Sequence, residues 1–317
     1  MRKILITGVS GFVGRHLVAR LLREGRDLTL AGRSPVANGA SNMATVLVGD
    51  IGPETDWRGA LRGCGAVVHL AAQVPAPGVA NEDFDRVNNR GTARLAEQAF
   101  EAGVQCFVLV SSVHAVADNS AKGVVSGDTP TDAATTPYGL SKLAAEAHVA
   151  EFSRLGRLGI SIRPPLIYGW DAKGNWRHLQ RLAASGLPLP FGAVHNRRSF
   201  VAVDNLVDAL ETVVSGTPDP SMSGTYSVAD AEAVSLAEIA AWLQEGMRVP
   251  PRRLSVPEGF LRLLLRMAGQ GRIVRSLLED LEVDSSRFRA AFGWSPPRAT
   301  KDAMIASAAR YLASRRS

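Results

Sequence analysis

The stretch Ile4-Leu5-Ile6-Thr7-Gly8-Val9-Ser10-Gly11-Phe12-Val13-Gly14 decides the fold of this chain. A short apolar run leads into glycines at three-residue spacing, and an amphipathic stretch then continues to Leu22. This order predicts a strand, a tight turn and a helix. Gly8 permits the turn, Gly11 lets a pyrophosphate approach the backbone, and Gly14 lets the helix pack closely on the strand.

The residues after the third glycine exclude one rival interpretation of this turn. Gly14 is followed by Arg15-His16, whereas a P-loop continues with Lys-Ser or Lys-Thr. Nucleotide hydrolysis is therefore not expected, and the helix N-terminus is expected to face the phosphates of a dinucleotide. The predicted contacts of the turn with this cofactor are Gly8, Ser10, Gly11, Phe12, Val13 and Gly14.

Strand and helix patterns alternate through the first half of the chain. Further strands are predicted at 28–31, 45–48, 66–70, 107–110 and 160–162, with helices between them, the clearest at 83–102. This alternation predicts an α/β, Rossmann-like, doubly wound parallel sheet. The pattern becomes irregular after Arg163-Pro164-Pro165. We therefore expect a dinucleotide-binding domain at 1–165, rejoined by parts of 199–230, and a smaller, mainly substrate-binding C-terminal domain at 166–317.

Composition narrows the cellular setting. The 317 residues are 46% hydrophobic, which is ample for a packed core, and no stretch approaches the roughly 20 apolar residues of a membrane span. Cys64 and Cys106 form no disulfide framework, and no Cys/His spacing indicates a metal site. We expect a reduced, cytoplasmic protein without a transmembrane segment or a bound metal.

The net charge of +6 suits an anionic partner. The chain has no lysine-rich tail and no interleaved basic and aromatic residues, so we expect a nucleotide substrate and a cofactor rather than nucleic acid. The segment 260–267 alternates apolar residues with arginines. It is interpreted as a buried helix with arginines at its edge, and a helix on an anionic membrane surface is the alternative.

Tyr138-Gly139-Leu140-Ser141-Lys142 places a phenol and an ammonium on one helix face. Thr136 can cap this helix and Pro137 fits its first position. Tyrosine titrates near ~10, so it is a poor base at neutral pH unless a cation such as Lys142 favours its phenolate. Tyr138 could then take the proton of an alcohol while the carbon-bound hydrogen leaves as hydride.

The two motifs together resemble the signatures of the extended short-chain dehydrogenase/reductase family, which contains sugar-nucleotide epimerases, dehydratases and 4-keto reductases. The resemblance covers nearly the whole chain. It implies that Ser112, with Ser111 as the fallback, orients the substrate oxygen while Tyr138 exchanges the proton. Lys142 would hold the nicotinamide ribose and lower the pKa of Tyr138.

The resemblance also places cofactor contacts at Asp50-Ile51, Leu70-Ala71-Ala72 and Asn88. Without it, Asp50 could simply end a strand and Asn88 could lie on a helix surface. The second strand ends in Gly32-Arg33 rather than in the carboxylate that holds the ribose of NAD. Arg33 can meet a 2′-phosphate, so NADP is favoured over NAD, unless Arg33 is only a solvated loop residue.

On the substrate side, the resemblance implies that Asn175 and Arg198 bind a nucleotide diphosphate. Without it, Arg198 reads equally well as a solvated surface cation. His114 is interpreted as a hydrogen-bonded loop residue, with catalysis as the alternative. Glu146 is expected to pair with Lys142 and is assigned no chemistry.

The resemblance implies an NAD(P)-dependent 4-epimerase that acts on a UDP-hexose or UDP-N-acetylhexosamine through a 4-keto intermediate, in bacterial surface polysaccharide synthesis. A homodimer through the helices around Asn88 and Tyr138 is implied as well. An NADPH-dependent 4-keto sugar-nucleotide reductase is the alternative, favoured by Arg33. A non-catalytic dinucleotide sensor and a reductase of apolar ketones or aldehydes also remain open, although Ser112, Tyr138 and Lys142 argue against the sensor.

Overall fold

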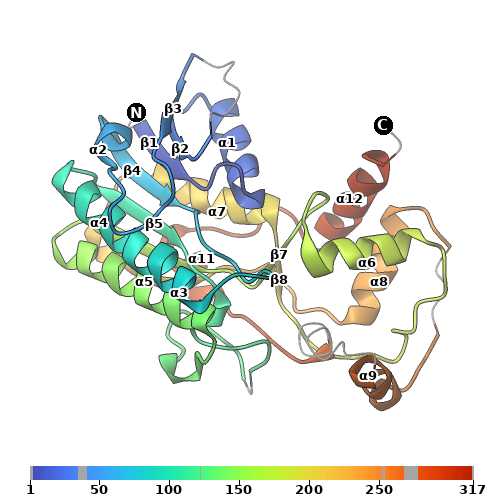
Figure 1. Cartoon of the computed structure of the whole chain (residues 1–317). Coiled ribbons are helices and arrows are strands. Elements are labelled where there is room, and N and C mark those ends of the chain that lie inside the picture. The colour runs from blue at the N-terminus through green and yellow to red at the C-terminus, as the bar shows by residue number, and fades with distance from the viewer. Residues whose placement is uncertain are drawn as a thin grey trace.

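The computed structural model describes residues 3–34, 41–121, 123–250, 252, 254–267 and 278–315. Its centre is a seven-stranded parallel sheet in the order β3-β2-β1-β4-β5-β6-β9 (Figure 1). The predicted parallel, doubly wound sheet is confirmed. Its strands are β1 (Lys3–Thr7), β2 (Leu28–Gly32), β3 (Met43–Leu47), β4 (Cys64–His69), β5 (Cys106–Val110), β6 (Leu158–Arg163) and β9 (Gly224–Ser227).

Helices cover both faces of the sheet because successive strand residues point to opposite sides. Ile4 and Ile6 belong to the apolar cluster on one face of the sheet, whereas Leu5 belongs to the cluster on the opposite face. The first layer contains α1 (Phe12–Arg23), α7 (Val203–Ser215) and α11 (Ser286–Phe292), and the second contains α2 (Arg58–Leu61), α4 (Gly91–Glu101) and α5 (Pro137–Arg154).

The long helix predicted at 83–102 contains a π-helical segment near its start. It consists of α3 (Asn81–Phe84), a π-helical segment at Asp85–Arg90, and α4. The start of α5 agrees with the sequence, because the Thr136 hydroxyl accepts a hydrogen bond from Gly139 N and Pro137 opens the helix. This cap fixes the first turn, which carries Tyr138.

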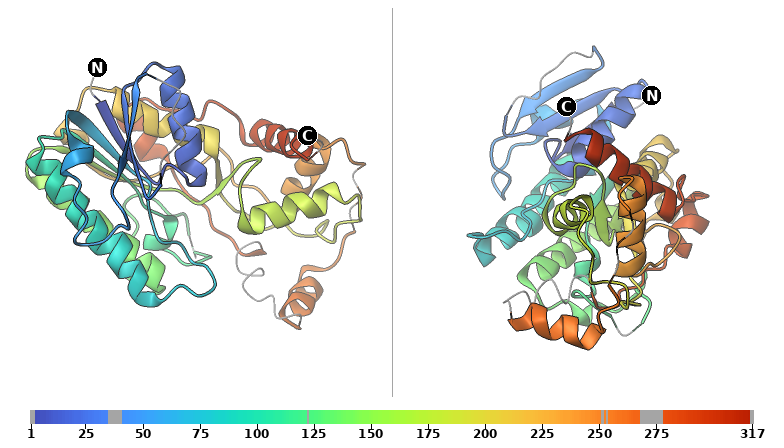
Figure 2. Two further views of the ribbon diagram at one scale, coloured as in Figure 1. Left: turned by 45° about the horizontal axis from the view of Figure 1, so that its top comes forward. Right: turned by 90° about the vertical axis from the view of Figure 1, so that its right-hand side faces the viewer.

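A second group of elements, here called the helical lobe, has its own core beside the sheet (Figure 2). A two-stranded parallel sheet of β7 (Leu166–Tyr168) and β8 (Phe200–Ala202) leads into it. Among the described residues, the lobe contains the helices α6 (Gly174–Ala184), α8 (Leu236–Gly246), α9 (Glu258–Met267) and α12 (Thr300–Ala313). Short 3-10 turns lie at Val113–Ala115, Thr131–Ala133 and Pro220–Met222.

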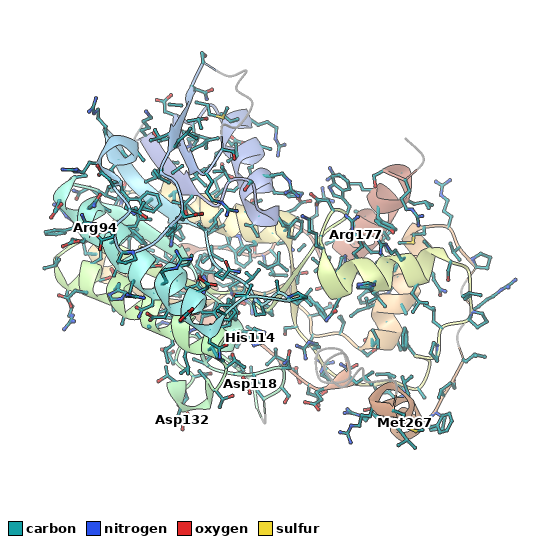
Figure 3. The ribbon with its side chains drawn as sticks, viewed as in Figure 1. Arg94, His114, Asp118, Asp132, Arg177 and Met267 are labelled. Carbon is teal, nitrogen blue, oxygen red and sulfur yellow. The ribbon has the colours of Figure 1, made fainter. Side chains whose placement is uncertain are left out.

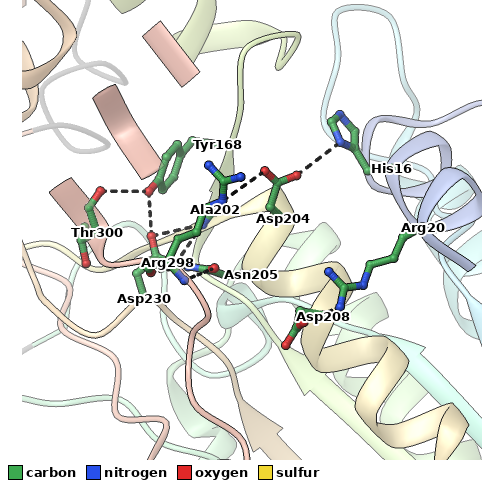
Figure 4. A network of polar contacts seen from close by, with 10 residues as sticks. All are labelled: His16, Arg20, Tyr168, Ala202, Asp204, Asn205, Asp208, Asp230, Arg298 and Thr300. Atoms are coloured by element: carbon green, nitrogen blue, oxygen red, sulfur yellow. Dashed lines mark hydrogen bonds and ion pairs between the residues drawn. The ribbon is translucent and has the colours of Figure 1, made fainter. Parts of the chain in front are cut away.

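A buried carboxylate joins the helical lobe to the sheet (Figure 4). Asp230 accepts hydrogen bonds from the Tyr168 hydroxyl at 2.8 Å, from Asn205 Nδ2 at 2.7 Å and from Ala202 N at 3.0 Å. Burial raises the pKa of Asp230, and these donors oppose that rise. Asp230 thus links β7, β8 and α7, and it fixes how the helical lobe packs against the sheet.

The interpretation of 260–267 as a buried helix with arginines at its edge is wrong, because one apolar face of the helix is exposed. In α9 Leu261 is buried, whereas Phe260, Leu263 and Met267 are more than half exposed. They follow one another at helical spacing and so share one exposed face. None of the helices in the described ranges is long and apolar enough to cross a membrane.

Candidate active site

The turn after β1 meets the end of β4 at van der Waals distance. Gly8 has φ +69°, and a Cβ built on it would lie 2.6 Å from Ala71 N. The Thr7 hydroxyl accepts hydrogen bonds from Leu70 N at 3.2 Å and from Ala71 N at 3.1 Å. Only glycine fits at this position. The turn after β1 and the end of β4, which are both predicted to contact the cofactor, therefore form one backbone surface.

The next two glycines bring the N-terminus of α1 onto this surface. Gly11 N donates to Gly8 O at 2.9 Å, and a Cβ on Gly14 would lie 2.2 Å from the same oxygen. The N–H groups in the first turn of α1 have no partner within the helix, and they lie beside glycine backbone that carries no side chain. This cradle fits a dinucleotide pyrophosphate. Ser10, Phe12 and Val13 complete the turn, with Ser10 exposed and Phe12 and Val13 half-buried.

Arg33 and Asp50 meet at the carboxyl edge of β2 and β3. Arg33 Nη1 lies 3.4 Å from Asp50 Oδ1, and both side chains are 77% exposed. An exposed pair of this kind is worth at most about 1 kcal/mol, so Arg33 can exchange it for a phosphate. Ile51 is half-buried and packs beside Gly91.

Asn88 is buried within the π-helical segment, not exposed on a helix surface. Its amide accepts from Gln73 N at 2.7 Å and donates to Gln73 O at 2.9 Å. It also donates to Ser141 Oγ at 3.0 Å. Asn88 therefore ties the loop that follows Leu70-Ala71-Ala72 to the helix that carries Tyr138 and Lys142.

Ser112 and Tyr138 are brought together by the packing of α5 on the turn after β5. A Cβ on Gly139 would lie 2.2 Å from His114 O, so the helix approaches this turn closely. The Ser112 hydroxyl lies beside Tyr138, where it lowers the pKa of the phenol, and it accepts a hydrogen bond from His114 N at 3.2 Å. Ser111 instead donates to Glu146 at 2.5 Å. The geometry favours Ser112 as the residue that orients a substrate oxygen.

Lys142 is buried one turn behind Tyr138, and its Nζ donates to Val110 O at 2.9 Å. Burial lowers the pKa of Lys142 to about 8, with Glu146 opposing this change. Burial raises the pKa of Tyr138, and the Ser112 hydroxyl beside it opposes that rise. Tyr138 thus needs a nearby cation to act as a base near neutral pH.

Two aromatic rings lie against Tyr138. The rings of Phe84 and His114 each meet it edge to face, with centroids 6.0 Å away. Burial and the charge of Arg198 lower the pKa of His114, while Asp118 opposes them. His114 and Asp118 lie below the sheet, on the side facing the helical lobe (Figure 3).

Arg198 is buried, so its interpretation as a solvated surface cation is wrong. Its Nη1 donates to Asn119 O at 2.7 Å and to Glu279 O at 3.2 Å, and its Nε has no hydrogen-bond partner among the described residues. Burial lowers the pKa of Arg198 to about 10. Asn175 lies in the first turn of α6 at an exposed position in the helical lobe.

Two polar residues at the site have contacts that the sequence did not indicate. Glu146 pairs with Arg163 rather than with Lys142, its expected partner. Nδ1 of His69 and the Thr7 hydroxyl share a hydrogen bond at 2.7 Å, and burial lowers the pKa of His69 to about 3. The position of His69 at the end of an apolar strand was the available signal. Across the described ranges, no cluster of three metal-ligating side chains occurs.

Comparisons with known proteins agree with this geometry. A family model described as the NAD dependent epimerase/dehydratase family matches residues 4–229. A UDP-glucose 4-epimerase from Vibrio cholerae is 31% identical over 98% of this chain and 96% of that protein.

Two solved structures share the fold over the whole length. A UDP-N-acetylglucosamine 4-epimerase from Bacillus cereus superposes with a TM-score of 0.78 at 20% identity, covering 100% of both chains. MoeE5 in complex with UDP-glucuronic acid and NAD superposes with a TM-score of 0.75 at 25% identity, covering 99% of both chains. The chain therefore belongs to the NAD-dependent epimerase/dehydratase family, within the extended short-chain dehydrogenases/reductases.

Proposed function

We propose that this protein is a 4-epimerase of a UDP-linked hexose or N-acetylhexosamine that works through a 4-keto intermediate. The observation that carries the proposal is the close packing of α5 on the turn that holds Ser112, with Tyr138 against His114 of that turn and Lys142 one helical turn further along α5. The full-length similarity to a UDP-glucose 4-epimerase supports the choice of substrate.

The residues of the site have distinct roles in this reaction. Ser112 hydrogen-bonds the C4 oxygen, and Tyr138 takes the C4 hydroxyl proton and later returns it. Lys142 favours the phenolate of Tyr138. A nicotinamide cofactor in the glycine cradle would accept and return the hydride. Arg198 and Asn175 would hold the nucleotide diphosphate while the 4-keto sugar turns over, and Arg198 can do so through charge-assisted hydrogen bonds.

The second candidate is an NADPH-dependent 4-keto sugar-nucleotide reductase, and Arg33 at the end of β2 favours it. Mass spectrometry of the released cofactor, followed by incubation with UDP-Glc and UDP-GlcNAc, separates the two. Formation of the 4-epimer without net redox change supports the epimerase. NADPH oxidation that requires a 4-keto sugar nucleotide would support the reductase instead.

Arg33→Gln is expected to weaken NADP binding about tenfold while NAD binding changes less than about twofold, because only NADP carries the 2′-phosphate. Isothermal titration with each cofactor measures this effect. Arg58→Gln is the control, since Arg58 is equally exposed and is paired with Asp56 beside the same sheet. Equal losses for both cofactors would show that Arg33 does not read the 2′-phosphate.

Arg198→Met is expected to raise KM for the UDP-sugar about tenfold or more, because a charge-assisted hydrogen bond contributes about 1.5–3 kcal/mol. The dissociation constant of UDP should rise in parallel. Arg197→Met is the matched control, because Arg197 is exposed and paired with Glu282. An unchanged KM would favour a substrate without a diphosphate, such as an apolar ketone.

We further propose that residues 1–165, rejoined by parts of 199–230, hold the cofactor and that 166–317 mainly hold the sugar nucleotide. The place of β9 and α7 in the sheet layers supports this division. A homodimer through α4 and α5 is supported by the surface hollow between them, which includes the exposed Leu155 and the half-buried Phe100. A cytoplasmic setting is supported by the two free cysteines, Cys64 and Cys106.

A further inference from the structure

Glu146 lies at the centre of a buried network behind the catalytic residues. It follows Lys142 by one helical turn on α5, and its side chain is 6% exposed. Its Oε1 accepts from Ser111 Oγ at 2.5 Å and from Arg163 Nε at 2.9 Å, and its Oε2 accepts from Arg163 Nη2 at 2.6 Å. These three donor groups come from the ends of two neighbouring strands.

These contacts connect parts of the site whose relative positions the reaction requires. Ser111 precedes Ser112 at the end of β5, and its N–H donates to Ile162 O at 2.7 Å. Arg163 ends β6 and also donates to Gly127 O at 3.2 Å, in the loop between β5 and α5. A single carboxylate thus fixes the helix of Tyr138 to the strand end that carries Ser112.

The same carboxylate acts on the charge of Lys142. The titratable and charged groups that face Lys142 are Tyr138 and Glu146 on its own helix and His69 on β4. Burial holds His69 neutral near pH 7, because it lowers the pKa of His69 to about 3. Among these groups, Glu146 alone opposes the loss of the proton from Lys142 at neutral pH. Arg163 neutralises Glu146 from the other side, which limits its repulsion of the Tyr138 phenolate.

We propose that Glu146 is a positioning residue for the epimerisation, one that holds Ser112 in place through Ser111 and keeps Lys142 positively charged. This inference rests on the proposed function of the site. It predicts an alkaline limb of kcat near pH 8, because the active form carries protonated Lys142 and loses that proton as the pH rises.

The test uses two variants, since Glu146→Gln alone leaves Arg163 as an unpaired buried cation and can prevent folding. The double variant Glu146→Gln/Arg163→Gln removes both charges and keeps amide groups in their place. In the folded double variant we expect the alkaline limb of kcat to move down by about one pH unit, because the opposite charge near Lys142 is lost. KM for the UDP-sugar should change less than about twofold.

Ultraviolet titration of the tyrosinate in the cofactor-loaded protein gives a readout that needs no sugar substrate. With Tyr138→Phe subtracted, the midpoint of Tyr138 should rise by about one pH unit in the double variant. If the wild type fails to epimerise UDP-hexoses, the proposed function is wrong, whereas this titration still tests Glu146.

Glu151→Gln provides the matched control, because it removes the same charge from an exposed position on the same helix. It should leave the pH profile and the Tyr138 midpoint unchanged. A folded double variant with an unmoved alkaline limb and an unmoved midpoint would overturn the inference. A kcat lowered evenly at every pH would likewise show that the network is only structural.

Discussion

Replacing Tyr138 with phenylalanine is expected to lower kcat about a thousandfold, with little change in KM or in bound cofactor. The hydroxyl is the group that exchanges the proton, and positioned acid–base catalysis contributes about 10²–10⁴-fold. The ring itself would stay in place, because its edge contacts with Phe84 and His114 do not involve the hydroxyl. The loss should therefore appear in the chemical step alone. Initial rates of epimer formation measure it.

Tyr226→Phe is the control for this substitution. Its hydroxyl donates to Met222 O at 2.7 Å and lies outside the site, so only a small loss of stability is expected. The cofactor content of both variants should match that of the wild type. If Tyr138→Phe kept kcat within tenfold of the wild type, another group would have to carry the proton, and His114 would be the first to examine.

Local signals in the sequence predicted the first half of the fold well. The strands around Ile4-Leu5-Ile6 and 107–110 are continuous apolar runs, as expected for strands buried on both faces. The start of α5 was also predicted, because the cap at Thr136 and the proline after it act within one turn. Such features depend on neighbours in the chain, so the sequence alone reveals them.

The second half was harder to predict because its elements depend on distant partners. β7 and β8 have three residues each, and they exist only because they pair with each other, although residues 169–199 separate them in the chain. The π-helical segment around Asn88 likewise serves tertiary hydrogen bonds that no local pattern shows.

The same limit applied to the details of the site. The sequence left Ser111 and Ser112 open, and their different partners in space distinguish them. Glu146 was assigned to Lys142 by helical spacing, whereas its partner Arg163 lies on a strand. The burial of Arg198 could not be read from its neighbours either, since Arg197 beside it is exposed.

The second large effect is expected for Gly14→Ala, which should weaken NAD or NADP binding by at least about a hundredfold and destabilise the fold by about 1–3 kcal/mol. The added Cβ would lie 2.2 Å from Gly8 O and 2.8 Å from Val9 Cα. Both contacts are with backbone, so no side chain can rotate away, and α1 must shift from β1. That shift moves the N–H groups of its first turn out of the phosphate position.

Calorimetric titration of the cofactor and thermal unfolding measure the two parts of this prediction separately. Gly59→Ala is the control, because Gly59 is also helical and a Cβ there meets nothing within 4 Å. That variant should bind cofactor as the wild type does and be as stable or slightly more so, since alanine favours a helix. Gly14→Ala with wild-type cofactor affinity would show that close packing of α1 on β1 does not set the cofactor site. The expected contrast arises because one methyl group meets backbone at Gly14 and open space at Gly59.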